Sequence, residues 1–424
     1  MKYWILAVAL FALPDASWAR SYQFRLVASE PQSLAGSIKA VAINDLGEVA
    51  WSRSVPADVL RAKPGDLPTT LATGVPDGTR IYLDNQGRVG FEDLPVLRRG
   101  EGSVSAEVLW NFDDGTYGGS TLVSGGFFLG LPGDLWMMSR SGTYVFLGQW
   151  FLDNAQYTGN KNIFYGPGGP FALTNPATSP GDPFPFDQGN STYGVASLAI
   201  GRNDTVAFSE GVSYSDLNCP DHSYVVRMDG FNPVALASPT NGLGCFPTTV
   251  DDVNGNGDVL FTATDSTTQD EGLYISRYLV TELAVGLGDG VYSQLHEAFF
   301  DDARNLAFSA SLTTDPHGTP PGIFTGPGGL ADKLVGDGDS LFGGTINNPQ
   351  LGGINASGQI AFEAILTPDG ADVGDLIVVR ADPVPEPASA AAAGIALATL
   401  ACVYRKRARD GRSSWSRART HAGV

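Results

Sequence analysis

A nine-residue pattern that occurs seven times constrains the fold of this chain more than any other feature. Its first copy runs from Ile43 to Trp51, and every copy ends at an aromatic residue. The other copies end at Phe91, Phe146, Phe208, Phe261, Phe308 and Phe362. Successive aromatics lie 40 to 62 residues apart, which is the length of a four-stranded sheet with its loops. The chain therefore consists largely of repeated units of this size.

Each copy predicts a tight turn followed by a strand. The second position holds Asn, Asp or Ser in six copies, and the fifth holds Gly in five. These residues favour a type I turn, because a short polar side chain bonds the backbone ahead and Gly accepts the exit conformation. The seventh and ninth positions are bulky and the eighth is usually smaller, as in Val49-Ala50-Trp51. Since successive strand residues point to opposite faces, we expect the aromatic face of one unit to pack on the small-residue face of the next.

These features predict an all-β body over residues 20–382. A Gly count of 53 and a Pro count of 27 suit short strands and tight turns. Sheets that are apolar on both faces must stack, which favours a β-propeller with seven blades, although six or eight also fit. Segments 22–27 and 375–380 look like neighbouring strands, so we expect the C-terminal strand to complete the first blade and lock the ring.

The N-terminal residues 1–19 predict a secretory signal helix. Lys2 precedes an apolar run from Trp4 to Leu13, and small residues stand at Ser17 and Ala19. A positive charge, an apolar stretch and a small-residue cleavage site are the three parts of such a signal. Cleavage after Ala19 would export the body.

The C-terminal part predicts a sorting signal over residues 383–409. Its motif is Val384-Pro385-Glu386-Pro387, and residues 388–404 carry no charge. An uncharged, mostly apolar stretch of this length approaches a transmembrane helix. The basic residues that follow are Arg405, Lys406, Arg407 and Arg409. They indicate a cytoplasmic end, with a basic tail at 410–424.

The order of these three C-terminal elements resembles the PEP-CTERM sorting domain. That resemblance implies cutting by an exosortase after transient anchoring in the inner membrane, and then display at the cell surface or in an exopolysaccharide matrix. The internal copies beginning at Asn44, Asn254 and Asn355 resemble the tandem NxxGxxAF repeats that occur with such anchors. That resemblance implies surface display and no particular activity.

The net charge argues against one class of binding partner, and the cysteine positions predict one disulfide. The net charge is −19 although seven basic residues lie beyond Tyr404, which argues against nucleic acid, whose phosphates require a basic surface. Of the three cysteines, Cys402 lies in the apolar tail. Cys219 and Cys245 lie in the exported body, where we expect them to form a disulfide.

One segment resembles half of a calcium loop. Its oxygen-bearing side chains belong to Asp252, Asn254, Asn256 and Asp258. Their alternate spacing before Gly fits calcium, but the twelfth position is Ala263 and lacks the distal carboxylate. Because the segment coincides with a repeat, a structural turn is the stronger interpretation.

No spacing typical of a zinc site, serine hydrolase or redox pair occurs, so the sequence favours a non-enzymatic protein that requires no cofactor. We expect a structural or polysaccharide-binding component of the cell surface or exopolysaccharide matrix. Two alternatives stay open, an exported hydrolase or lyase that acts on polysaccharide and a calcium-stabilised adhesion module.

Overall fold

A computed structural model describes residues 20–384 apart from internal gaps. The gaps are 32–37, 55, 76–79, 94–95, 101–106, 112–115, 118–119, 122–125, 131–135, 153–160, 167–170, 173–193, 214–220, 230–231, 239–240, 279, 315–321 and 372. The predicted signal helix, the motif beyond Val384, the membrane helix and the basic tail lie outside the described residues. Within the described part of the chain, no helix is both long and apolar enough to cross a membrane.

Contacts divide the chain into two units. One comprises Met1–Ala19 with Phe24–Asp382, and the other Arg20–Gln23 with Pro383–Val424. The first unit holds the repeats, and its described strands form seven sheets with antiparallel pairings. We number the sheets by the repeat hairpin that each contains.

The first four sheets are built from consecutive chain segments. The first contains β2 (Ile38–Ile43), β3 (Val49–Ser54), β4 (Ala57–Ala62) and β5 (Thr69–Thr73). The second contains β6 (Ile81–Leu83), β7 (Val89–Asp93), β8 (Val96–Gly100), β9 (Glu107–Asn111), β10 (Thr116–Tyr117) and β11 (Ser120–Thr121). The third contains β12 (Gly126–Gly130), β13 (Trp136–Met138), β14 (Tyr144–Leu152), β15 (Lys161–Gly166) and β16 (Phe171–Ala172). The fourth contains β17 (Gly194–Ile200), β18 (Val206–Ser213), β19 (Asp221–Asp229) and β20 (Asn232–Ala237).

The last three sheets follow the same order, and the seventh also takes in the N-terminal strand. The fifth contains β21 (Thr249–Val253), β22 (Val259–Thr264), β23 (Glu271–Arg277) and β24 (Val280–Gly286). The sixth contains β25 (Tyr292–Phe300), β26 (Leu306–Leu312), β27 (Gly322–Phe324) and β28 (Lys333–Val335), with a 3₁₀ helix, η2 (Gly329–Asp332). The seventh contains β29 (Ser340–Leu341), β30 (Gly344–Ile354), β31 (Ile360–Pro368), β32 (Asp375–Pro383) and β1 (Tyr22–Pro31).

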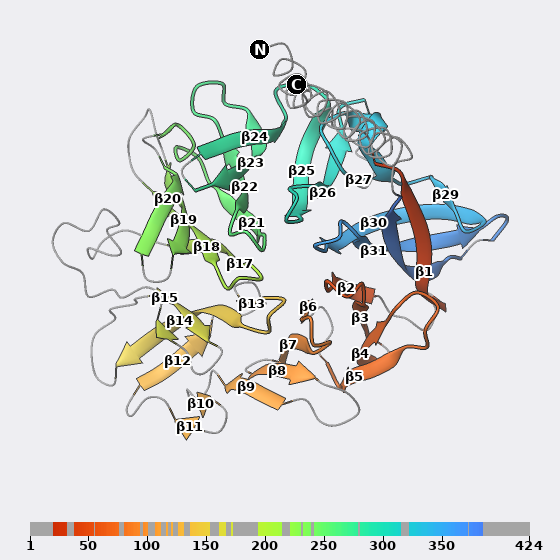
Figure 1. Ribbon diagram of the computed structural model, residues 1–424, viewed down its shortest axis with the longest axis horizontal. Helices are drawn as coiled ribbons and strands as arrows, with labels where there is room; N and C mark the ends of the chain where they lie inside the picture. The colour runs from red at the N-terminus through yellow and green to blue at the C-terminus, as the bar shows by residue number, and fades with distance from the viewer. Residues whose placement is uncertain are drawn as a thin grey trace, which may run out of the picture. The chain divides into compact units, whose positions relative to one another are not determined.

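The innermost strands form a closed cycle. In order, β2, β6, β13, β17, β21, β25 and β30 each contact the next, and β30 contacts β2 again (Figure 1). This all-β, propeller-like arrangement agrees with the predicted fold class. An open stack of hairpins would leave the first and last inner strands apart, so the cycle is the observation that favours a propeller over a stack.

The first and last described strands lie in one sheet, as predicted, but not in the predicted one. The first sheet is completed by β2 to β5 alone, whereas β1 lies beside β32 in the seventh. The prediction that the C-terminal strand completes the first sheet was wrong, because the four consecutive strands β2 to β5 already form that sheet. The N-terminal strand therefore completes the last sheet, which hides the edge of β32.

The predicted packing rule is confirmed by the core clusters. Val49 and Trp51 of the first sheet share a cluster with Ala361 of the seventh. The same bulky-on-small arrangement joins Ala50 with Phe91, Val145 with Phe208, Ala207 with Phe261, and Leu260 with Phe308. At the second sheet the small residue is Gly90, where an added Cβ would lie 3.0 Å from the Met138 sulfur. The repeat pattern thus encodes how each sheet meets its neighbour.

Candidate functional site

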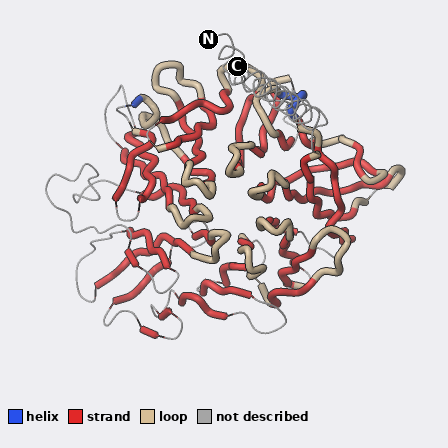
Figure 2. Tube along the Cα trace, in the orientation of Figure 1, coloured by secondary structure: helices blue, strands red, loops and turns tan. Residues whose placement is uncertain are grey.

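The repeat turns lie around the centre of the ring, because every inner strand leads directly into its turn (Figure 2). In the first copy, the Gly47 amide donates to the Asn44 carbonyl at 3.1 Å, and the other six copies repeat this bond. The fifth residue has a positive φ in all seven, including 62° at Asp204 and 65° at Arg304. The predicted turn geometry is therefore confirmed even where Gly is absent.

The corner asparagines also join neighbouring sheets. Asn44 Oδ1 accepts the amides of Leu46 and Glu48, while its Nδ2 donates to the Asp84 carbonyl at 2.9 Å. Asn355 Nδ2 donates to the Asn44 carbonyl at 2.9 Å, which bridges the last hairpin to the first. Since Asn44 and Asn355 are fully buried, losing such a bond leaves a buried polar group unsatisfied.

Charged side chains at the turn tips contact one another between hairpins. Asp45 accepts hydrogen bonds from Arg140 at 2.7 Å and Arg202 at 3.0 Å, which belong to the third and fourth hairpins. It also accepts from Asn85 Nδ2 at 2.8 Å and from the Ala356 amide at 3.0 Å. We call Asp45, Arg140, Arg202 and Asp302, which pairs with Arg202, the turn-end network. Its four residues come from four of the seven hairpins.

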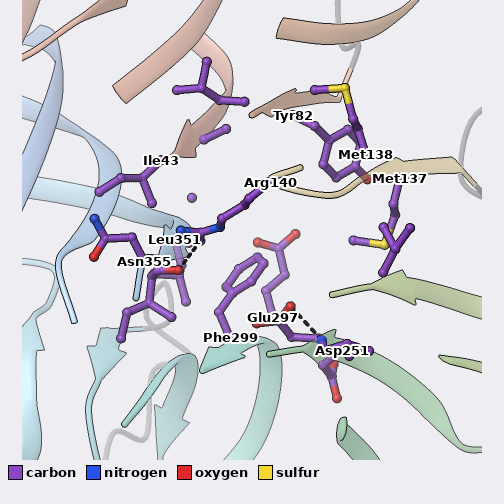
Figure 3. Close-up of a pocket in the computed structure, with 18 of the residues that line it drawn as sticks. Ile43, Tyr82, Met137, Met138, Arg140, Asp251, Glu297, Phe299, Leu351 and Asn355 are labelled. Carbon is purple, nitrogen blue, oxygen red and sulfur yellow. Dashed lines mark hydrogen bonds between the residues drawn. The ribbon is translucent and has the colours of Figure 1, made fainter. Parts of the chain in front are cut away.

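The pKa of Asp45 reflects this network. Burial by itself would raise the pKa, but Arg140, the Ala356 amide, Asn85 and Arg202 together outweigh it and hold the pKa below its usual value. Asp45 is therefore ionised at neutral pH and balances the charge of the arginines. Arg140 also donates to the Ile354 carbonyl across the ring (Figure 3).

A cavity of about 660 Å³ occupies the centre of the ring next to this network. It is lined by the inner strands and by Arg140 and Arg202. Cavities of this size bury much of a small ligand. The cavity is therefore a candidate ligand-binding site.

Apolar side chains line the cavity on several sides. Figure 3 shows Tyr82, Met137 and Phe299 around the cavity, with Leu351 on another side. Tyr82 is fixed, because its hydroxyl donates to the Trp136 carbonyl at 3.0 Å and its ring packs edge-on against Trp136 at 4.8 Å. Aromatic and aliphatic surfaces of this kind can pack against the carbon skeleton of a ligand.

Carboxyl groups from β21 and β25 supply the polar chemistry. Burial raises the pKa of Asp252 to about 6, even though the Phe300 amide bonds its Oδ2 at 3.1 Å and Arg140 acts in the opposite direction. Burial also raises the pKa of Asp251 to about 8, against a hydrogen bond from Thr262 Oγ1 at 2.9 Å. These two carboxyl groups are held by strand backbone and side chain, so their positions are fixed.

Glu297 differs from the two aspartates. Its side chain lies in the cavity (Figure 3), and no described residue donates a hydrogen bond to its carboxylate. Glu297 is exposed to solvent in the open cavity. The protein around it still removes enough water to raise its pKa, while Arg80 and His296 act in the opposite direction. Glu297 is therefore a carboxyl group free to bind a ligand or to exchange a proton with one.

The sequence did not identify these residues. Glu297, Asp251, Arg80 and Tyr82 belong to no repeat position, because they precede the turns on the inner strands. The sequence nevertheless contains a signal for cavity-lining residues. Counting back two and four residues from each corner gives the inner-strand residues on one face, and among them Tyr82, Arg80, Phe299 and Glu297 stand out.

The four predicted calcium ligands make separate contacts. Asn254 Oδ1 accepts the amides of Asn256 and Asp258, and Asp258 pairs with Arg304 at 3.1 Å. Asn256 donates to the Asp302 carbonyl, and Asp252 lines the cavity. The described residues contain no cluster of three or more His, Cys, Asp or Glu side chains suited to a metal ion. The turn interpretation accounts for these contacts, and calcium binding stays untested.

The predicted disulfide is only partly visible. Cys245 is buried and disulfide-bonded. Cys219 lies outside the described residues, so the pairing of these two cysteines stays a prediction.

Comparisons with known proteins give distant structural similarities only. No family model matches the chain, and no curated protein matches it. A streptogramin B lyase structure is 10% identical over 87% of this chain and 100% of its own, with a TM-score of 0.40. A polysaccharide lyase is 9% identical over 83% of this chain and 91% of its own, with a TM-score of 0.43. A gluconolactonase from Xanthomonas campestris is 14% identical over 88% and 94%, with a TM-score of 0.34. Likeness at this level says nothing about what this chain binds.

Proposed function

We propose that this protein is an exported, seven-bladed β-propeller that is displayed at the cell surface and binds polysaccharide through its central cavity. The cavity carries the proposal. It combines apolar surfaces at Tyr82, Met137 and Phe299 with a hydrogen-bonding group at Glu297. Sugar ligands require both, because their ring faces are apolar and their hydroxyl groups need acceptors.

Seven blades are supported by the seven sheets and by the cycle of inner strands. Export and display are supported by the sequence of residues 1–19 and 383–409. Mass spectrometry of the secreted protein tests both ends. We expect a mature N-terminus at Arg20 and a C-terminus near Pro387. A cell-associated chain that retains residues 388–424, and that does not change when Pro385 and Pro387 are replaced, would contradict exosortase processing.

Glycan-array binding of the full-length chain in detergent tests the binding function. The matched variants are Glu297→Gln, which removes the cavity charge without changing shape, and Glu282→Gln on β24. Glu282 is exposed and pairs with Arg304, and such surface pairs contribute little. We expect polysaccharide binding that Glu297→Gln weakens and Glu282→Gln does not. Absence of binding, or equal binding by both variants, would count against this cavity.

A second function is favoured by one observation. Burial raises the pKa of Glu297, Asp251 and Asp252 within one cavity, and a carboxyl group with a raised pKa is better suited to act as a general acid than an ordinary one. This pattern fits a hydrolase or lyase acting on polysaccharide. New reducing ends or unsaturated products from a bound polysaccharide, lost in Glu297→Gln, would establish it, and intact polysaccharide would leave binding as the function.

A further inference from the structure

We infer that the N-terminal strand controls how fast the C-terminal tail is cut, because the residue before this strand is bonded to the first residue of the tail motif. The inference rests on the proposed export and tail processing, and it gives β1 a regulatory role in that processing. It follows from a contact that joins the two predicted cleavage regions. Ser21 lies two residues after the predicted signal cleavage site at Ala19, and Val384 begins the motif.

Ser21 and Val384 are bonded through their backbones. The Val384 amide donates to the Ser21 carbonyl at 2.8 Å, and both residues belong to the second unit. Residues 383–387 include three prolines, which have no backbone N–H to donate to a neighbouring strand. Val384 therefore carries one of only two backbone N–H groups in this stretch, and that group is already engaged.

The strand that follows Ser21 is fixed by side-chain contacts of the first unit. Val27 is buried in the core cluster that the first and seventh sheets share. Phe24 packs edge-on against Phe362, with ring centroids 6.1 Å apart. Arg25 pairs with Asp382 at 2.7 Å. Because β1 is held beside β32 in this way, the bond from Val384 to the N-terminal segment depends on how firmly β1 is attached.

The engaged amide limits access to the motif. Extended peptides are commonly recognised through their main-chain hydrogen bonds, and the Val384 amide cannot form such a bond while it donates to Ser21. Strand ends open locally far more often than a whole protein unfolds. Proteolysis of an opened segment follows the population of the open state when opening and closing are fast. The rate of tail cutting should therefore rise as β1 is loosened.

Pulse-chase labelling of the full-length chain in a bacterium that carries an exosortase measures this rate. Phe24→Ala removes the packing against Phe362. Leu26→Ala is the matched control, because Leu26 is an exposed apolar residue of the same strand. We expect Phe24→Ala to raise the rate of cutting at least about threefold by enlarging the open population. Leu26→Ala should cut at the wild-type rate.

Hydrogen exchange of the purified full-length chain in detergent reports on the contact itself. The peptide that contains Val384 should exchange faster in Phe24→Ala than in the wild type or in Leu26→Ala, while peptides from the fifth sheet keep their wild-type exchange. Faster exchange throughout the body would show that Phe24→Ala unfolds the protein. In that case Arg25→Ala, which removes only the pair with Asp382, takes its place with the same two measurements.

The outcomes separate this inference from the proposed function. An unchanged or slower rate of cutting in a variant whose Val384 peptide exchanges faster would overturn the inference and leave exosortase processing in place. Equal exchange of that peptide in all variants would overturn it as well, because β1 would then not hold Val384. If the wild-type chain keeps residues 388–424, the proposed processing fails and the inference fails with it.

Discussion

The two parts of the central channel use charge in opposite ways. At the turn end, Asp45 is matched by two arginines, an asparagine and a backbone amide, and its pKa is lowered. In the cavity, Glu297 accepts no hydrogen bond from the described residues and its pKa is raised. The turn end therefore has its polar groups satisfied within the fold, whereas the cavity keeps polar groups that a ligand can satisfy.

The repeat residues resemble the turn end, because their side chains are engaged within the fold. Corner residues make turns, the fifth residue takes a positive φ, and the small residue meets the next sheet. The aromatic is buried in the six copies whose aromatic side chain the structure describes. Because these positions are occupied by folding, the motif does not reveal the function. Function must instead be sought at inner-strand positions that vary between copies.

The largest expected effect comes from removing a repeat aromatic. Phe308 is fully buried, packs against Tyr292 and Phe324 at 5.4 and 5.9 Å, and shares a cluster with Leu260 of the neighbouring sheet. Phe308→Ala should lower the free energy of unfolding by about 3–5 kcal/mol. Denaturant unfolding measures this, with Leu330→Ala as the control because Leu330 is exposed. A small loss in the free energy of unfolding would mean that packing of the aromatic face contributes little to holding neighbouring sheets together.

The next effect tests the bond that links the last hairpin to the first. Asn355→Asp removes the donor to the Asn44 carbonyl and places a charge in a buried site, so we expect a loss of about 1–3 kcal/mol. In the second repeat the corner residue is already an aspartate, Asp84. Its carboxylate pairs with Arg88, four residues later in the chain, at 2.6 Å. Gln359 occupies the matching position. Adding Gln359→Arg should restore part of the loss, and a double variant no better than the single one would contradict this reading.

These two cases show what the sequence could predict. Phe308 and Asn355 act through neighbours fixed by the repeat, so periodicity and turn chemistry sufficed for the hairpins, the turns and the sheet-to-sheet packing. The network of Asp45 with Arg140 joins residues from different hairpins, and Glu297 matters only because the ring encloses it. Such juxtapositions depend on how the sheets are placed around the axis, which no local pattern specifies.

Asp45 tests the turn end through pH. Its folded pKa lies below 3.8, so its stabilisation is present above the unfolded value and is lost as the pH falls through the folded pKa. Asp45→Asn should cost about 1–2 kcal/mol at pH 7. It should also reduce the loss of stability below about pH 4. Melting curves between pH 3 and 7 measure both, and an unchanged acid profile would show that Asp45 is not the hub of the network.

Asp251 should respond to pH with the opposite sign. Its pKa is raised to about 8, so the folded state keeps a proton that the unfolded state releases above its lower pKa, and stability declines as the pH rises from about 4 to 8. Asp251→Asn keeps an acceptor for Thr262 and removes this decline. We expect a melting midpoint a few degrees above wild type at pH 8 and little difference at pH 4. A variant that is less stable than wild type at both pH values would contradict the proposal that Asp251 is held neutral.

The smallest effect is expected from chelation. At the turn of the fifth repeat, Asn254 and Asp258 are engaged by backbone amides and by Arg304. These contacts leave few oxygen lone pairs for calcium, so EDTA should shift the melting midpoint by less than about 1 °C. Asn256→Ala serves as the control, because Asn256 bonds only the Asp302 carbonyl through its side chain at an exposed site. A fall of several degrees with EDTA, reversed by added calcium, would instead establish the calcium-stabilised alternative. It would also show that this turn, like the cavity, keeps polar groups that the fold alone does not satisfy.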